Sequence, residues 1–289
     1  MAEGTARGIA LLAASTIVFT AMDLQAQYLS RHYPTSEIAF ARYVGNLIIV
    51  ALIFLPRRGL RLLHTRRLGL QLLRSALLVI CTFGFFFSLR YMPLADAVAI
   101  GLVSPIIVTA LSRPLLKERI GWRRWTAVAI GFAGALVIVR PGLGTLHWSA
   151  SVVLLVAFCY ALFQILTRKL AEGEDSVTTL FYSALVGTVG LALPLPFEAS
   201  GPQSAWHLLL LASLGLWGTL GGFLLIRAFV HAPAVVLAPL TYLSLPTSAL
   251  GGLLIFGDFP DGWTWLGAGI LIATGLYIFH RERLRGGAG

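Results

Sequence analysis

Few ionisable side chains interrupt the long apolar stretches of this 289-residue sequence, and these side chains are the first candidates for chemistry. Asp23 lies about two helical turns before the end of one apolar stretch, and Arg42 lies about two turns into the next. Because a short connection joins the stretches, two helices would place the carboxylate and the guanidinium at a similar depth. The pair is interpreted either as a structural ion pair or as a site where a ligand's ammonium and carboxylate, or a proton, compete for these charges.

Amide side chains occupy matching positions in the two halves of the chain. Gln25 aligns with Gln164 at an offset of 139 residues, and an amide can donate and accept hydrogen bonds at once. The two amides are expected to face one another, either as ligands of a zwitterionic or amide-bearing substrate or in hydrogen bonds between helices. Arg74 and Arg227 lie near the ends of apolar stretches, where a long side chain can extend its charge to the lipid headgroups.

Prolines and aromatic residues mark the expected cavity. Proline inside a helix leaves a backbone carbonyl without its donor, which a membrane tolerates only where protein or a water-filled cavity satisfies that carbonyl. Aromatic side chains either line such a cavity or pack against lipid. We therefore assign the hinges to Pro105, Pro239 and Pro246, and the cavity wall to Asp23, Gln25, Arg42, Phe86, Ser104, Pro105, Gln164, Trp217 and Tyr242.

The composition identifies the kind of elements that must position these residues. The sequence is 57% hydrophobic and 12% charged with a mean hydropathy of +0.84, whereas soluble domains carry roughly 25% charged residues. Apolar runs near the roughly 20 residues that cross a bilayer indicate an all-α integral membrane protein. Ten transmembrane helices are predicted, at 7–30, 36–55, 69–90, 94–113, 122–140, 148–168, 175–196, 204–230, 234–256 and 262–280.

An internal repeat divides these ten helices into two sets of five. The stretch 94–125 recurs in altered form at 232–265, and at an offset of 140 residues Glu118 falls on Asp258 and Trp125 on Trp265. The first repeat is predicted at 1–140 and the second at 141–289. Because five is odd, the two repeats cross the membrane in opposite senses, an arrangement common in transporters. Most Lys and Arg outside the spans fall in loops on the side of the N-terminus, which predicts that both termini are cytoplasmic.

Several function classes lack their residues. No phosphate-binding Gly-Lys-Ser/Thr loop, metal-ligand cluster or nucleophile motif occurs, so no cofactor, metal or catalytic residue is expected, and the chain is not predicted to be an enzyme. Cys81 and Cys159 lie in apolar runs and are interpreted as packing residues. The formal charge of +10 is attributed to membrane orientation, because no basic soluble face for nucleic acid is present.

The sequence resembles the drug/metabolite transporter superfamily, specifically its ten-helix EamA-type members. The similarity covers nearly the whole chain and is carried by the break at Ser104-Pro105, the loop 115–119 followed by Trp125, and the segments 233–236, 256–258 and 265–268. This resemblance implies two inverted five-helix repeats that move small organic metabolites by alternating access. Asp258 stands where the family usually has Glu, so a strict role for that longer carboxylate does not carry over.

The resulting hypothesis is a secondary transporter of the bacterial inner membrane that exports amino acids, with aromatic or hydrophobic ones favoured. An uptake carrier for another metabolite or cofactor is the alternative, and a channel or an intramembrane enzyme is a more distant one. The expected partners are a small-molecule substrate and the lipid bilayer, with no nucleic acid, and the chain is expected to be a monomer or a homodimer.

Overall fold

The computed structural model describes residues 2–116, 122–140, 148–171, 173–198, 200–232 and 237–286, and within these ranges every regular element is helical. The first half contains α1 (Ala2–Leu29), α2 (Thr35–Arg58), η1 (Gly59–Leu63), α3 (Leu68–Ser88), α4 (Leu94–Gly101), α5 (Ser104–Leu116) and α6 (Trp122–Val139). The second half contains α7 (Trp148–Ala171), α8 (Ser176–Ala192), α9 (Leu195–Glu198), α10 (Ala205–His231), η2 (Ala238–Leu243), α12 (Ser244–Phe256) and α13 (Gly262–Gly286).

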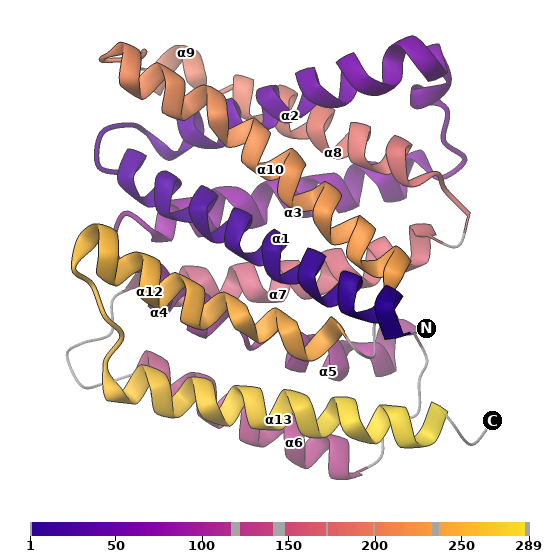
Figure 1. The fold of residues 1–289 in the computed structure, drawn as a ribbon, viewed down its shortest axis with the longest axis vertical. Coiled ribbons are helices and arrows are strands. Elements are labelled where there is room, and N and C mark those ends of the chain that lie inside the picture. Colours follow the sequence, from indigo (N-terminus) through magenta and orange to yellow (C-terminus); the bar gives the residue numbers. More distant parts are fainter. Residues whose placement is uncertain are drawn as a thin grey trace.

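Ten apolar helices fall at the ten predicted spans, and six of those that the structure describes are long and apolar enough to cross a membrane. Six qualify at full length: Ala6–Leu29, Thr35–Arg58, Leu68–Ser88, Leu94–Leu111, Trp148–Thr167 and Ala205–His231. Four shorter apolar helices supply the others: Trp125–Val139, Ser176–Ala192, Leu240–Phe256 and Gly262–Ile278. The two termini lie at the same end of the bundle, as an even number of crossings requires (Figure 1). The predicted fold class, an all-α membrane protein built from two repeats, is confirmed.

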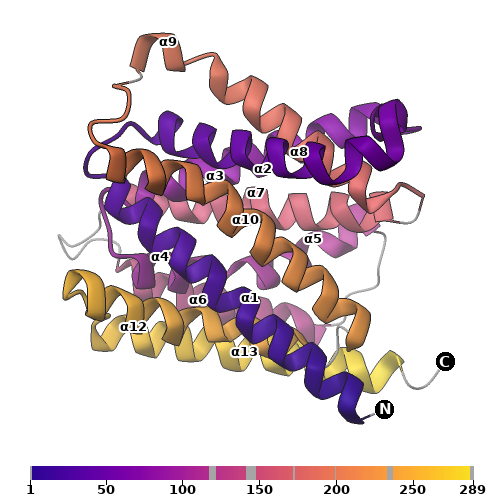
Figure 2. The same ribbon diagram turned by 45° about the horizontal axis from the view of Figure 1, so that its top comes forward.

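Close packing between the halves depends on small residues. Helix α1 lies along α10 in both views of the ribbon (Figures 1 and 2), while α6 packs along α13 and α3 along α7. In the α6–α13 pair, a Cβ added to Gly134 would lie 2.8 Å from Ile270 Cγ2 and 3.1 Å from the carbonyl oxygen of Gly267. Gly134 and Gly267 therefore permit close contact between α6 and α13 within one chain.

Both predicted helix interruptions are present. The fourth span breaks at Leu102–Val103, so that α4 ends at Gly101 and α5 begins at Ser104, one residue before Pro105. The ninth span opens as the 3₁₀ helix η2, which contains Pro239, before α12 begins at Ser244. Proline is tolerated at these positions because the first residues of a helix need no intrahelical donor.

The two interrupted spans contact each other through one pair of segments. Helix α4 packs against α12, at the end of the bundle opposite to the termini (Figure 1). Helix α5 packs on α6 and α7, which α4 also contacts, while η2 packs on α1 and α12. The breaks therefore let the two interrupted spans meet at one end and follow separate neighbours at the other.

Candidate functional site

Asp23 on α1 and Arg42 on α2 lie near enough to interact electrostatically, but they do not form the predicted ion pair. The Nη1 of Arg42 donates a hydrogen bond to Thr82 Oγ1 on α3 at 3.0 Å. Among the residues that the structure describes, the Asp23 carboxylate has neither a hydrogen bond nor an ion pair. The prediction of a direct pair was wrong because a hydroxyl on a third helix holds the guanidinium instead.

Neutral groups surround the guanidinium of Arg42. Its carbon atom lies 5.6 Å from the ring centroid of Tyr43 and 5.6 Å from that of Phe86, and cation–π attraction stabilises such an arrangement. The Tyr43 hydroxyl is 2.9 Å from Thr82 Oγ1 and donates to the carbonyl of Leu78 at 3.2 Å. The buried Nε of Arg42 has no hydrogen-bond partner in the described part of the chain. Arg42 is thus positioned without being neutralised.

Aromatic rings on α7 adjoin this charged group. Tyr160 and Phe163 stack with centroids 5.5 Å apart and planes at 21°. Tyr160 is 41% exposed, yet it interacts electrostatically with both Arg42 and Arg74. Part of the Tyr160 ring is therefore left uncovered by the rest of the protein. The sequence alone does not connect these two rings with either arginine.

Arg74 contradicts the expectation that it reaches the headgroups, because it is buried in the bundle. Its Nε donates to Thr167 Oγ1 at 2.8 Å, its Nη1 donates to Ser183 Oγ at 2.5 Å, and its guanidinium lies 4.5 Å from the centroid of Phe163. These partners lie on α7 and α8, about a hundred residues further along the chain. Arg227, in contrast, is exposed on α10, as expected.

The two matching glutamines bond to different helices and not to one another. Gln25 Nε2 donates to the carbonyl of Leu210 at 2.5 Å and to Ser213 Oγ at 3.0 Å, and its Oε1 accepts from Trp217 Nε1 at 3.1 Å. Gln164 Nε2 donates to Ser104 Oγ at 3.4 Å. The expectation that the two amides face each other was wrong, because each turns to a neighbouring helix that offers partners. Interhelical bonding, the alternative, is what the structure shows.

The remaining predicted site residues have different surroundings. Phe86 is 1% exposed and therefore lies beneath Arg42, not on an open wall. Ser104 is buried, Pro105 is exposed, and Tyr242 is half-buried against Gly275 of α13. The backbone of Pro239 belongs to η2, whereas its side chain and the whole of Glu118 lie outside the described residues. No cluster of metal-ligating side chains occurs in the described ranges.

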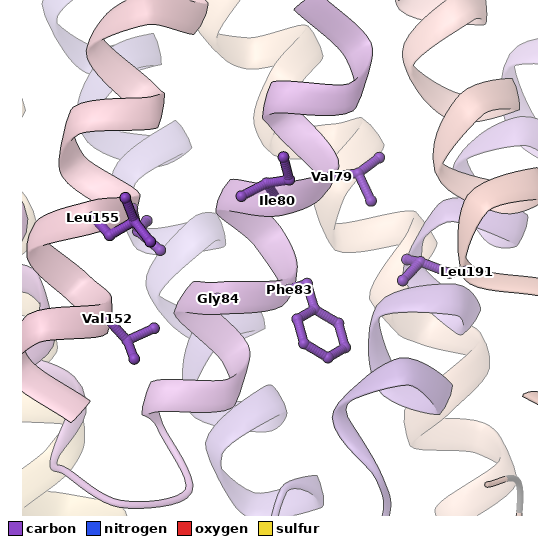
Figure 3. Close-up of a pocket in the computed structure, with 8 residues that line it drawn as sticks. Val79, Ile80, Phe83, Gly84, Val152, Leu155 and Leu191 are labelled. Atoms are coloured by element: carbon purple, nitrogen blue, oxygen red, sulfur yellow. The ribbon is translucent and has the colours of Figure 1, made fainter. Parts of the chain in front are cut away.

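An apolar groove on the outside of the bundle is distinct from this interior. It has a cavity volume of about 250 Å³, and Figure 3 shows its α7 side chains on one side of α3 and Leu191 of α8 on the other. The lining is formed by Val79, Ile80, Phe83, Gly84, Val152, Leu155, Val156 and Leu191. Ile80 and Leu155 are 50% and 59% exposed, so the groove opens outward, where hydrocarbon of the bilayer would fill it.

The fold and composition define a multi-pass membrane protein, and comparison with known proteins identifies its family. The model of the EamA-like transporter family matches residues 6–140 and 147–279, so the chain belongs to this family. It is 30% identical over 276 residues to the S-adenosylmethionine uptake transporter of Rickettsia prowazekii, covering 96% of this chain and 93% of that protein.

Other similar proteins carry different names. The riboflavin transporter of Vibrio cholerae is 30% identical over 92% of this chain and 90% of its own length. The pseudopaline exporter of Pseudomonas aeruginosa is 29% identical over 96% of both chains. A solved crystal structure with 17% sequence identity covers 91% of this chain and 95% of its own at a TM-score of 0.60, which shows the fold alone. Transport of small metabolites is thereby supported as a class.

Proposed function

We propose that the chain is a secondary transporter for small metabolites that combine an amino-acid head group with a flat aromatic ring system. The observation that carries this proposal is the pair of opposite charges on adjacent helices that do not neutralise each other, the Asp23 carboxylate and the Arg42 guanidinium. A ligand's ammonium would bind Asp23 and its carboxylate Arg42. An intramembrane charge is costly and is usually retained for such a purpose.

The stacked rings of Tyr160 and Phe163 supply the second part of the proposed site. An aromatic face favours offset stacking with another flat ring and also attracts a cation. Since Tyr160 is partly exposed and lies near Arg42, a ligand whose carboxylate binds the guanidinium can place its ring against Tyr160.

Two substrates of this kind are favoured by different observations. S-adenosylmethionine has the head group, an adenine ring and a sulfonium cation that aromatic rings attract, and proteins named for its uptake are about 30% identical to this chain. Aromatic amino acids, the export substrates predicted from the sequence, have the same two parts, and a relative of similar identity is named an exporter. Riboflavin lacks the head group, and Asp23 and Arg42 would have no charges to bind.

The proposed transport cycle uses the helix breaks. Helix α4 packs against α12 at the end opposite to the termini, whereas α5 and η2 follow separate neighbours toward the other end. We infer that the cavity opens toward the termini in this state and that rocking about Pro105, Pro239 and Pro246 exchanges the open end. The repeats at 1–140 and 141–289 would then move as the two halves, with both termini cytoplasmic in a bacterial inner membrane.

A counterflow experiment tests the substrate class. Proteoliposomes loaded with unlabelled S-adenosylmethionine, tryptophan or riboflavin are diluted into the same compound in labelled form. Saturable accumulation is expected with S-adenosylmethionine, tryptophan or both, and none with riboflavin. Accumulation of riboflavin alone would refute the proposed recognition of a head group, while unsaturable flux of all three compounds would indicate a channel.

A further inference from the structure

Arg74 is a buried cation whose described partners are all neutral. The side chain is 8% exposed, and its contacts are the hydroxyls of Thr167 and Ser183 and the ring of Phe163. The described ion pairs join other residues, Arg58 with Asp175 and Arg140 with Asp261. Arg74 therefore has no counter-charge within the described part of the chain.

The two hydroxyls serve Arg74 only as acceptors. Thr167 Oγ1 donates its own proton to the carbonyl of Phe163 at 2.7 Å, and Ser183 Oγ donates to the carbonyl of Thr179 at 2.8 Å. Each hydroxyl is thus already bonded within its own helix and contributes no negative charge. The guanidinium Nη2 donates to none of the described residues, which leaves one edge of the group available to a ligand.

The charges of the interior do not balance. Arg42 also lacks a direct carboxylate partner, and Asp23 interacts electrostatically with Arg42 without pairing with it. A cation taken out of water without a counter-charge is strongly disfavoured, so a buried guanidinium is expected to acquire an anion. Three residues before Arg74, the fully buried Gln71 leaves its Oε1 without a partner; because this oxygen can only accept, a water bound beside the anion would satisfy it, whereas the anion itself would not.

From these contacts we propose that Arg74 binds a small monovalent anion, either a halide or a carboxylate, at a site separate from the Asp23–Arg42 pair. The site lies six residues into α3, about 9 Å from the end of the bundle that holds the termini. Tyr160 interacts with both arginines, and its stacked partner Phe163 packs on Arg74. A substrate carboxylate leaving Arg42 would therefore meet a second guanidinium on its way out.

The test requires no transport assay and is independent of the proposed substrate. Detergent-purified protein is melted in sodium chloride, sodium acetate or sodium gluconate at equal concentration, gluconate being too bulky for a buried site. A ligand of the folded state raises Tm in a saturable way. Tm is expected to rise with chloride, with acetate or with both, relative to gluconate. Chloride alone would identify a halide site, and acetate alone a carboxylate site.

Matched variants separate anion binding from packing. Arg74→Met should lose the anion response and melt no lower than the wild type in gluconate, because Thr167 and Ser183 keep their bonds within the helices. Arg74→Lys should keep a response because it keeps the charge. The control is Arg227→Met, since Arg227 is exposed with its guanidinium 6.0 Å from the Phe223 ring, and it should respond like the wild type.

Two results would each overturn the proposal whatever the other variants do. The first is a wild-type Tm that is the same in all three salts. The second is an anion response that survives in Arg74→Met, which would place the site elsewhere. If Arg74→Met does not fold, Arg74→Gln takes its place as the uncharged variant. Loss of the response in Arg74→Gln, with retention in Arg74→Lys and Arg227→Met, would then assign the site to Arg74, and a response that survives in Arg74→Gln would overturn the assignment.

Discussion

Gln25 joins α1 to α10 through three hydrogen bonds, whereas its counterpart Gln164 makes one long bond to Ser104. Replacing Gln25 with Leu removes all three bonds and leaves the Trp217 indole N–H without its acceptor. Interhelical hydrogen bonds in membrane proteins average about 0.6 kcal/mol, so the variant should lose about 2 kcal/mol of stability. Gln164→Leu, with one bond at 3.4 Å, should lose less than about 0.6 kcal/mol.

The assay is reversible unfolding in mixed micelles, followed by tryptophan fluorescence and by circular dichroism, with both variants measured beside the wild type. Counterflow on the same preparations separates structural from substrate contacts, because Gln25→Leu should lower stability while leaving the apparent substrate affinity nearly unchanged. Equal stability losses in the two variants would refute the reasoning from hydrogen-bond number. A large affinity loss in a stable Gln25→Leu protein would make Gln25 a substrate ligand.

Two further predictions concern local structure. A Cβ at Gly215 would collide with the Gly45 backbone of α2, so Gly215→Val should lower the free energy of unfolding by about 1–3 kcal/mol. A Cβ at Gly222 on the same helix would meet nothing within 4 Å, so Gly222→Val should leave the free energy of unfolding nearly unchanged. Partial desolvation raises the pKa of Asp261, but hydrogen bonds from Thr264 and the ion pair with Arg140 outweigh it and hold that pKa below its ordinary value of 3.8. The ionised Asp261 carboxylate stabilises the fold at pH values above 3.8, and this stabilisation is lost as the pH falls through the lowered pKa. Because the Asp261 side chain is 45% exposed, Asp261→Asn should lower the free energy of unfolding by at most about 1 kcal/mol at pH 7. At pH 2 the Tm of the variant should match that of the wild type. A difference in Tm that persists at pH 2 would contradict the electrostatic explanation.

The span pattern could be predicted from the sequence because it depends on local properties. Ten apolar runs near membrane thickness, an internal repeat and prolines at corresponding places require only hydropathy and backbone chemistry. The structure confirms the spans and the interruptions before Ser104 and around Pro239. The internal repeat recurs at an offset near 140 residues along the chain, so each copy supports the interpretation of the other.

Side-chain partners could not be predicted in the same way, because they depend on how each helix is rotated against neighbours distant in sequence. Depth alone suggested that Asp23 and Arg42 pair, yet Arg42 donates its hydrogen bond to Thr82 Oγ1 on α3. Depth also placed Arg74 within reach of the headgroups, but Thr167 and Ser183 supply acceptors inside the bundle. Nothing local to Arg74 in the sequence indicates those two hydroxyls.

The central claim is that Asp23 and Arg42 recognise the two charges of an amino-acid head group, and trimming the ligand tests it most directly. Inhibition of counterflow is measured with tryptophan, with tryptamine, which lacks the carboxylate, and with indole-3-propionate, which lacks the ammonium. A hydrogen bond to a charged group contributes about 1.5–3 kcal/mol, so each trimmed compound should bind roughly 10- to 100-fold more weakly than tryptophan. In Arg42→Met, tryptophan and tryptamine should become nearly equal. Equal inhibition by all three compounds in the wild type would contradict the account.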